Sequence, residues 1–368
     1  MRPPELACRP DAELVCRRME LWWEKEILDR PAIQVIAPGP HRFPIPESFH
    51  RSLRDRWMDT QYQADRARAI IQNMYFAGEA LPFYMPDLGP ELLSAAYGCE
   101  LEFGEETSWS IPCLRDLSQA PDLRFDPENV YIRKIVEITS ACLEAGKGIY
   151  LTGMADIHAG ADLAAALRDP QQLCLDLADS GEDVHKLLET IRPAFFEIYN
   201  LLEAVIRGTG QTLMISWLPL FSPGRYYIPS CDFSAMISPG TFAQFFLPEL
   251  IDEIEWLDRS IYHLDGPRAL CHLDTILAIP GLDAVQFVPG AGSMPAATWI
   301  PVCRRIQDAG KNIHMQIEPH EIDQFMEALS PEGVMLSITA SSVEEADWLV
   351  QKTRGWKSKR RQHELCKS

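Results

Sequence analysis

Short apolar runs alternate with segments of helical periodicity along the C-terminal half of the chain. After residue 260, four apolar runs are each followed by a helical pattern, at a spacing of roughly 20 to 30 residues. The expected strands are Tyr262–Leu264, Ala284–Val288, Ile313–Ile317 and Val334–Ile338. The expected helices are Arg268–Ala278, Thr298–Ala309, Pro319–Leu329 and Val343–Thr353. This alternation predicts an α/β fold with a parallel sheet.

The upstream sequence carries the same two patterns with longer intervals. Strands are expected at Pro31–Pro38, Gly148–Gly153 and Thr212–Trp217. Helices are expected at Asp11–Leu28, Asp55–Gly78, Glu91–Tyr97, Pro127–Ala145, Ala161–Arg168, Pro170–Ala178, Glu182–Gly208 and Pro239–Leu257. The number of strand–helix units favours a closed (β/α)8 TIM-type barrel. A doubly wound sheet is disfavoured, because no glycine-rich phosphate-binding fingerprint follows an expected strand. We expect one barrel domain over residues 1–368, with 1–120 as an N-terminal helical elaboration packed on it.

The stretch Ser260–Pro267 is typical of a strand–helix junction in a barrel enzyme. Its apolar run is interrupted by His263 and Asp265, and Gly266 and Pro267 end the strand. Two residues separated by one position on a strand point to the same side. Catalytic groups of parallel α/β enzymes lie at the C-terminal ends of strands. His263 and Asp265 are therefore candidates for metal binding, proton transfer or substrate binding, although the pair could also form an interior hydrogen bond only.

Other polar and aromatic residues follow the expected strands in the same way. They are Asp156, His158, Trp217, Tyr226, Tyr227, Cys231, Asp232, Gln286, Gln316, Glu318, His320, Ser337 and Thr339. Trp109 is expected in a loop of the N-terminal portion. Buried polar groups are costly unless they are paired, so this number at one end of a barrel predicts a polar pocket.

Composition and charge narrow the function classes. The chain of 368 residues has a net charge of −19, which argues against a nucleic-acid partner. No apolar run approaches about 18 residues, so no membrane span is expected, and the absence of a signal-peptide pattern predicts a cytoplasmic protein. The ten cysteines contain no CxxC pair and are expected to be free thiols.

Three kinds of chemistry fit the candidate residues. Zinc could be held by His263, Asp265 and Glu318, with His320 and Cys231 as further ligands. A carboxylate pair, Asp265 with Glu318 or Asp156, could serve general acid/base or glycosidic chemistry. A pocket of Asp, His and Tyr could donate a proton in decarboxylation. The residues themselves do not rank these three.

Residues from about 125 to 355 resemble the uroporphyrinogen decarboxylase superfamily, which contains the decarboxylase of haem synthesis and corrinoid-linked methyltransferases. The resemblance lies in Tyr-His-Leu-Asp-Gly-Pro at 262–267, in Pro-Gly-Leu-Asp-Ala-Val-Gln at 280–286 and in Ser-Pro at 238–239. It implies a (β/α)8 barrel with its site at the C-terminal face and, by analogy, a homodimer. Asp265 stands where the zinc methyltransferases carry a cysteine. The segment Ile33–Ala37 lacks the arginine of the decarboxylase motif.

The resemblance leads to a first hypothesis, a methyltransferase that moves a methyl group between a small substrate and a corrinoid protein, with zinc as a possible cofactor. Its catalytic residues would be His263, Asp265, Glu318 and Asp156, the first three also being the metal ligands. Its substrate-binding residues would be His158, Trp109, Trp217, Tyr226, Tyr227, Asp232, Gln286 and His320. The second hypothesis is a metal-independent hydrolase or lyase that uses paired carboxylates on a small polar substrate. The third is a binding protein without catalysis on a barrel scaffold.

Overall fold

The computed structural model describes residues 1–290, 292 and 294–357. Its centre is a seven-stranded sheet of order β2-β1-β13-β12-β11-β10-β9, in which all neighbours are parallel except β1 and β2. Its strands are β1 (Ile33–Pro38), β2 (Met74–Gly78), β9 (Tyr226–Tyr227), β10 (Arg259–Asp265), β11 (Ala284–Val288), β12 (Asn312–Ile317) and β13 (Val334–Thr339). The prediction of an α/β fold with a mainly parallel sheet is confirmed.

Three smaller ladders complete the strand set. They pair β3 (Phe83–Tyr84) with β6 (Leu151–Thr152) in parallel, and pair β4 (Glu100–Phe103) with β5 (Ser108–Ile111) and β7 (Met214–Ile215) with β8 (Phe221–Ser222) in antiparallel fashion. Just after β6, the Gly153 N–H donates to the Tyr84 carbonyl at 2.8 Å and the Met154 N–H donates to the Ile215 carbonyl at 2.7 Å. Because the ladders of the described residues form four separate sheets, closure into a complete barrel stays a prediction.

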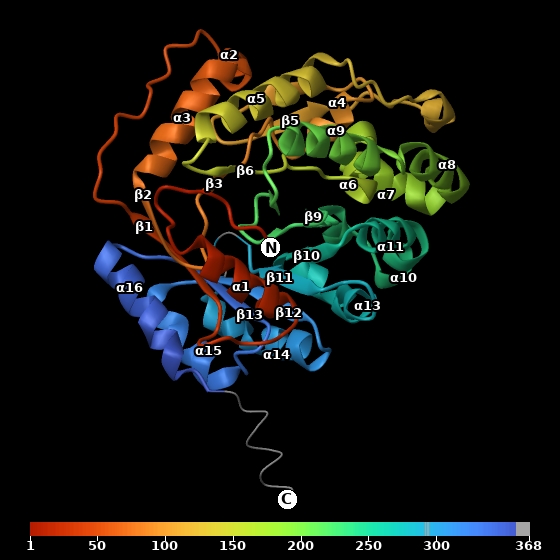
Figure 1. The fold of residues 1–368 in the computed structure, drawn as a ribbon. Coiled ribbons are helices and arrows are strands. Elements are labelled where there is room, and N and C mark those ends of the chain that lie inside the picture. Colours follow the sequence, from red (N-terminus) through yellow and green to blue (C-terminus); the bar gives the residue numbers. More distant parts are fainter. Residues whose placement is uncertain (291, 293, 358–368) are drawn as a thin grey trace, which may run out of the picture.

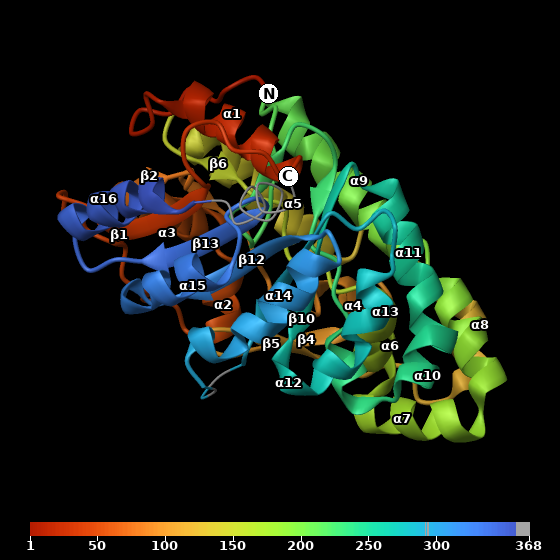
Figure 2. The ribbon, with the colours of Figure 1, turned by 90° about the horizontal axis from the view of Figure 1, so that it is seen from below.

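Most helices lie around the periphery of the strands (Figures 1 and 2), whereas α1 (Ala12–Trp23) lies across the N-terminal end of β12, where the Asn312 amide donates to the Trp22 carbonyl at 3.0 Å. The other helices are α2 (Leu53–Met58), α3 (Thr60–Gln72), α4 (Leu92–Ala95), α5 (Val130–Gly146), α6 (Gly160–Arg168), α7 (Pro170–Asp179), α8 (Gly181–Ile191), α9 (Ala194–Gly208), α10 (Pro239–Thr241), α11 (Leu247–Trp256), α12 (Gly266–Ala269), α13 (Leu273–Leu277), α14 (Ile300–Asp308), α15 (Ile322–Ala328) and α16 (Val343–Lys352). Such a cover leaves the carboxyl ends of the parallel strands as the place for a site.

The strands β10 to β13 of the central sheet are buried over most of their length. Their matched residues, such as Val285 opposite Ile313 and Ile313 opposite Val334, are at most 1% exposed. Strands covered on both faces read as continuous apolar runs, which is the pattern seen in the sequence. Gly266 follows β10 with a φ of 77°, a left-handed conformation that favours glycine. This residue allows the sharp change from strand β10 to helix α12 that the stretch Ser260–Pro267 predicts.

Several predicted boundaries differ from the structure. The expected helix Asp55–Gly78 contains α2, α3 and then β2, which pairs antiparallel with β1. The expected helix Glu182–Gly208 is two helices, because Pro193 lacks the N–H that a continuous helix would need. The expected helix Pro239–Leu257 begins as α10, passes through the π-helical turn Phe242–Phe246 and continues as α11.

Residues 1–120 supply strands β1 to β5 as well as helices α1 to α4, so this portion contributes to the central sheet itself.

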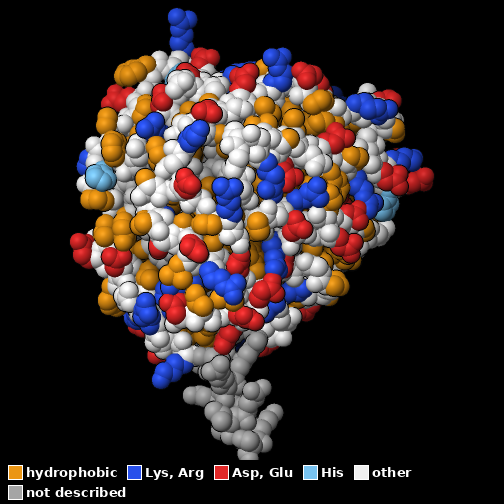
Figure 3. All heavy atoms as spheres, viewed as in Figure 1, with side chains coloured by type: hydrophobic (Ala, Val, Ile, Leu, Met, Phe, Trp, Pro, Cys, Tyr) orange, Lys and Arg blue, Asp and Glu red, His pale blue; other side chains and the backbone are white. Residues whose placement is uncertain are grey.

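The face in Figure 3 shows Lys and Arg side chains interspersed with Asp and Glu. Within the described residues, no helix is long and apolar enough to cross a bilayer. The nine described cysteines are free thiols, as expected.

Candidate functional site

Six acidic and histidine side chains gather beyond the C-terminal ends of β6, β9 and β10. We call this group the strand-end cluster; it consists of Asp156, His158, Asp162, Asp232, His263 and Asp265. The loop after β6 supplies its first two residues, and α6 supplies Asp162 in its first turn. Because side chains alternate along a strand, β10 directs both His263 and Asp265 to one side. The sequence prediction that polar side chains meet at this edge therefore has a structural counterpart.

His158 lies among three carboxylates. Its Nε2 is 3.3 Å from an oxygen of Asp156, and its Nδ1 is 3.7 Å from Asp162 and 3.9 Å from Asp232. Burial by itself would lower the pKa of the imidazole, but the attraction of the three carboxylates outweighs burial and raises the pKa of His158 to about 10. His158 is therefore an imidazolium at neutral pH, and its charge compensates the acidic groups around it.

Asp162 holds the loop that carries Asp232. One carboxylate oxygen accepts the backbone N–H of Phe233 at 2.8 Å, and the other accepts the N–H of Asp232 at 3.0 Å. Burial raises the pKa of the Asp162 carboxyl, while the positive charge of His158 acts in the opposite direction. Asp162 thus connects α6 to the segment after β9 and fixes the backbone of Asp232 beside the two histidines.

The hydrogen bonds of His263 determine its tautomer. The Nδ1 of His263 is 2.7 Å from the Oε1 of Gln286, its neighbour in register on β11. An amide oxygen only accepts hydrogen bonds, so Nδ1 carries a proton, and in the neutral imidazole the lone pair is then on Nε2. The rings of Trp217 and His263 pack perpendicular to each other, with 5.0 Å between their centroids. His263 is therefore held by Gln286 and Trp217 with a free Nε2, which is 3.9 Å from an oxygen of Asp232.

Two sets of three residues could each hold a metal ion, and they share Asp232. One set is His158, Asp162 and Asp232, and the other is Asp232, His263 and Asp265; within each set the ligand atoms lie within 4.8 Å of one another. The first set already contains the imidazolium of His158. In the second set, burial and the charge of Asp232 raise the pKa of Asp265, and His263 opposes this rise. Because His263 offers a lone pair and the protonated His158 does not, the second set is the better candidate for binding a metal ion.

A cavity of about 310 Å³ lies beside His263. Trp217 and Gln286, which both contact His263, also line this cavity. Further lining residues come from β1, β12 and β13, including Gln34, His314 and Ser337. The volume is near the lower limit of about 300–1,000 Å³ for small-molecule sites. The cavity and the strand-end cluster together can accept a small molecule next to a metal or proton-transfer group.

Asp87, in the loop after β3, is a further acidic group near the cluster. Burial raises the pKa of its carboxyl to about 6, and the charge of Asp156 adds to the rise. The Gly89 N–H donates to its Oδ1 at 2.7 Å. A carboxyl group that changes its ionisation near neutral pH is suited to general acid/base catalysis.

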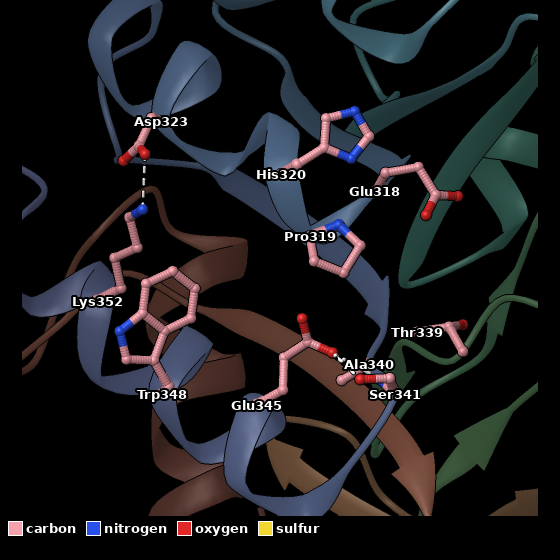
Figure 4. A pocket seen from close by; sticks show the side chains of 10 residues that line it. All are labelled: Glu318, Pro319, His320, Asp323, Thr339, Ala340, Ser341, Glu345, Trp348 and Lys352. Carbon is pink, nitrogen blue, oxygen red and sulfur yellow. Dashed lines mark hydrogen bonds and ion pairs between the residues drawn. The ribbon is translucent and has the colours of Figure 1, made fainter.

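Glu318 and His320 lie in a different place from the strand-end cluster. They line an open surface pocket of about 670 Å³ with residues of β13 and α16, and Figure 4 shows them opposite Trp348 and Glu345. The Glu318 side chain accepts the backbone N–H of Glu321 in a capping box. In the described part of the chain, no ion pair joins Glu318 to a member of the cluster. The structure therefore does not bring Glu318 to His263 and Asp265, and Asp232 lies there instead.

Besides Trp217, which contacts His263, three aromatic residues were predicted to bind substrate, and they have distinct environments. Trp109 is 46% exposed on β5, where its indole N–H donates to Glu102 at 3.0 Å. Tyr226 is fully buried, and its hydroxyl donates to the Leu218 carbonyl at 3.4 Å. Tyr227 is also fully buried, but its hydroxyl donates to Asp156 at 3.4 Å. Of the three, Tyr227 is the one that contacts the cluster.

Sequence reasoning missed Asp87, Asp162 and His314. Asp87 follows a strand of two residues that no periodicity can reveal. Asp162 lies four residues after His158 and at the start of a helix, a spacing that could have pointed to it. His314 lies two residues before Gln316 on a predicted strand, so strand alternation could have grouped these two residues. Cys231 is buried, and it is absent from both candidate metal sets of the described residues.

Comparison with known proteins gives a likeness in fold. No protein-family model matches the chain, and no curated protein matches it. Among solved structures, the chain is similar to a methyltransferase from Methanosarcina mazei, with a TM-score of 0.59 and 13% sequence identity. The match covers 92% of this chain and 98% of that protein. At this level of identity the likeness shows a shared fold, of the α/β type, across nearly the whole chain.

Proposed function

We propose that this protein is a methyltransferase that uses a divalent metal ion, zinc, bound by Asp232, His263 and Asp265. The carrying observation is that the three ligand atoms converge at the end of β10, next to a cavity of small-molecule size. The likeness in fold to a methyltransferase supports the choice of reaction class. A small substrate would occupy the cavity. A corrinoid protein is the expected partner for the methyl group, in line with the sequence resemblance.

The chemistry of the three residues fits zinc. Imidazole nitrogen and carboxylate oxygen are both zinc ligands, and catalytic sites commonly use three protein ligands with one position left open. The bond between Nδ1–H of His263 and Gln286 is the kind of second contact that orients a metal-binding histidine. A bound metal ion supplies Lewis-acid activation of a substrate heteroatom. The protein groups orient the substrate: Trp217 forms one wall, and the positive charge of His158 balances the carboxylates.

Elemental analysis of the purified protein tests this proposal. We expect near-stoichiometric zinc in the wild type, and its loss in His263→Ala, because this change removes the neutral nitrogen ligand. Glu318→Gln is the matched control, since Glu318 lies outside the cluster and should keep zinc. Methyl transfer from the small substrate to free cob(I)alamin, in which the bond between the methyl carbon and the substrate heteroatom breaks and a bond from this carbon to cobalt forms, should decrease in parallel with zinc and can be followed by absorbance. Zinc that remains in His263→Ala, or is lost in Glu318→Gln, would contradict the assigned ligands.

A metal-independent hydrolase or lyase is the second candidate, and Asp87 is the observation that favours it. Burial and the charge of Asp156 raise the pKa of Asp87 to about 6. A carboxyl group with a raised pKa beside a second carboxylate is the arrangement expected of a general acid and its charged neighbour. We expect Asp87 to titrate near pH 6 in a carboxyl-carbon NMR titration. The pKa should decrease in Asp156→Asn, because this change removes a nearby negative charge. Asp179→Asn, on the exposed end of α7, is the control. A pKa of about 4 for Asp87 in the wild type would exclude this role.

A further inference from the structure

The cavity beside His263 has an uncharged lining. Its described lining residues include no Asp, Glu, Lys or Arg, and their one ionisable group is the imidazole of His314. Most of the wall is apolar, with Met74, Phe76 and Phe83 among its members. The polar remainder consists of glutamine amides, hydroxyl groups and His314. We call this space the amide cavity. Its neutrality contrasts with the strand-end cluster, where every member is acidic or a histidine.

A chain of hydrogen bonds places a proton on the Nε2 of His314. The Gln34 amide nitrogen donates to the Pro219 carbonyl, so the Gln34 Oε1 is free to accept the Ser337 hydroxyl proton at 3.0 Å. The Ser337 oxygen must then accept from the Nε2–H of His314, at 2.8 Å. The Nδ1 of His314 is buried without a partner within the described residues. Burial lowers the pKa of His314 to about 3, in agreement with this arrangement.

Two glutamine amides remain available to a bound molecule. Gln316 lines the amide cavity, and its side chain makes no hydrogen bond within the described residues. Gln286 uses its Oε1 for His263, and its amide nitrogen likewise has no partner in the described part of the chain. The cavity thus offers both donors and acceptors without charge. A charged ligand would leave water and find no counter-ion on these walls, which is unfavourable.

We propose that the amide cavity binds an uncharged molecule the size of a single ring, with an apolar body and one hydroxyl or carbonyl group for Gln316 and Gln286, and that it discriminates against cations and anions of the same shape. This inference rests on the proposed function, because the molecule would be the small substrate held next to His263. It adds the class of that substrate. Gln316 is the residue that we assign to substrate selection.

Isothermal titration calorimetry with three probes of nearly equal shape tests the inference: benzyl alcohol, benzylammonium and benzoate. The wild type should bind benzyl alcohol at least about 10-fold more tightly than either ion, because the lining of the cavity offers an ion no opposite charge. Gln316→Glu introduces a carboxylate of the same size. This variant should bind benzylammonium more tightly than benzyl alcohol, by about 10-fold or more. Gln171→Glu, on the exposed surface of α7, should behave like the wild type.

Three results would each overturn the inference, two with the wild type and one with the variant. The first is binding of either ion to the wild type as tightly as benzyl alcohol, and the second is no binding of benzyl alcohol at all. The third is an unchanged preference in Gln316→Glu. His263→Ala separates this inference from the proposed function, because this variant should lose zinc but keep the preference for benzyl alcohol. A protein that binds benzyl alcohol but never zinc would refute the metal proposal and leave the amide cavity intact.

Discussion

Replacement of Asp232 by alanine is expected to abolish zinc binding and methyl transfer together. Asp232 belongs to both candidate metal sets, with its carboxylate 3.9 Å from His158 and 3.9 Å from His263. Removal of residues that merely orient a ligand costs about 10–100-fold in metal affinity, so the loss of a ligand itself should exceed about 100-fold. The pKa of His158 should also decrease, since Asp232 is one of the three carboxylates that raise it.

The fold should tolerate this change, because the Asp232 side chain is 43% exposed. Zinc affinity can be measured by competition with a chromogenic chelator, and methyl transfer with cob(I)alamin as acceptor. Asp274→Ala is the matched control, since Asp274 is a highly exposed aspartate on α13 that pairs with Arg305. Zinc affinity within about 10-fold of the wild type in Asp232→Ala would refute the shared-ligand arrangement.

Strand periodicity predicted the part of the site that lies on strands. The pair His263 and Asp265 follows from alternation along β10, and the partnership of His263 with Gln286 follows from the parallel register of β10 and β11. Both are local consequences of the backbone, so the sequence contains them. Most of the expected strands and helices after residue 260 are present with small changes of boundary for the same reason.

The loop residues could not be predicted equally well. Glu318 and Asp232 both follow strands of the central sheet, but Glu318 turns to cap the helical turn at Glu321, whereas the backbone of Asp232 is tied to Asp162. The position of Asp232 depends on a hydrogen bond between segments distant in the sequence, whereas the cap at Glu318 is a local contact. Asp87 was missed because the tertiary position of β3, and not its two-residue pattern, defines that strand. The length of a loop can be predicted from the sequence, but the position that its side chains take in the folded protein cannot.

The stability of the protein is expected to decrease as the pH rises from about 6.5 to about 10, and His158 should be the main cause. The pKa of His158 is raised from the ordinary value of 6.5 to about 10 in the folded protein. Between these values the folded state binds one more proton than the unfolded state, so the free energy of unfolding decreases with pH. The slope should approach about 1.4 kcal/mol per pH unit, for a total of a few kcal/mol. Below pH 6.5 this contribution is fully present.

Guanidinium denaturation at pH 7 and pH 9 measures this effect, and His158→Gln isolates it from other groups that titrate in the same range. The variant should be less stable at pH 7 by about 3–5 kcal/mol, because Asp156, Asp162 and Asp232 lose their shared cation. The difference between wild type and variant should become smaller at pH 9, since the wild type must then take up a proton on His158 when it folds, whereas the variant takes up none. His320→Gln, at an exposed position, should show the slope of the wild type.

A second substitution distinguishes charge balance from simple loss of packing. In His158→Gln combined with Asp162→Asn, one uncompensated buried charge is removed, so part of the stability lost at pH 7 should return. A packing defect at position 158 would persist in the double variant and would show no dependence on pH. Equal slopes with pH for the wild type and His158→Gln would mean that His158 is not the imidazolium of the cluster. In that case His158 would be neutral at pH 7, and the set of His158, Asp162 and Asp232 would be as available to a metal ion as the set that contains His263.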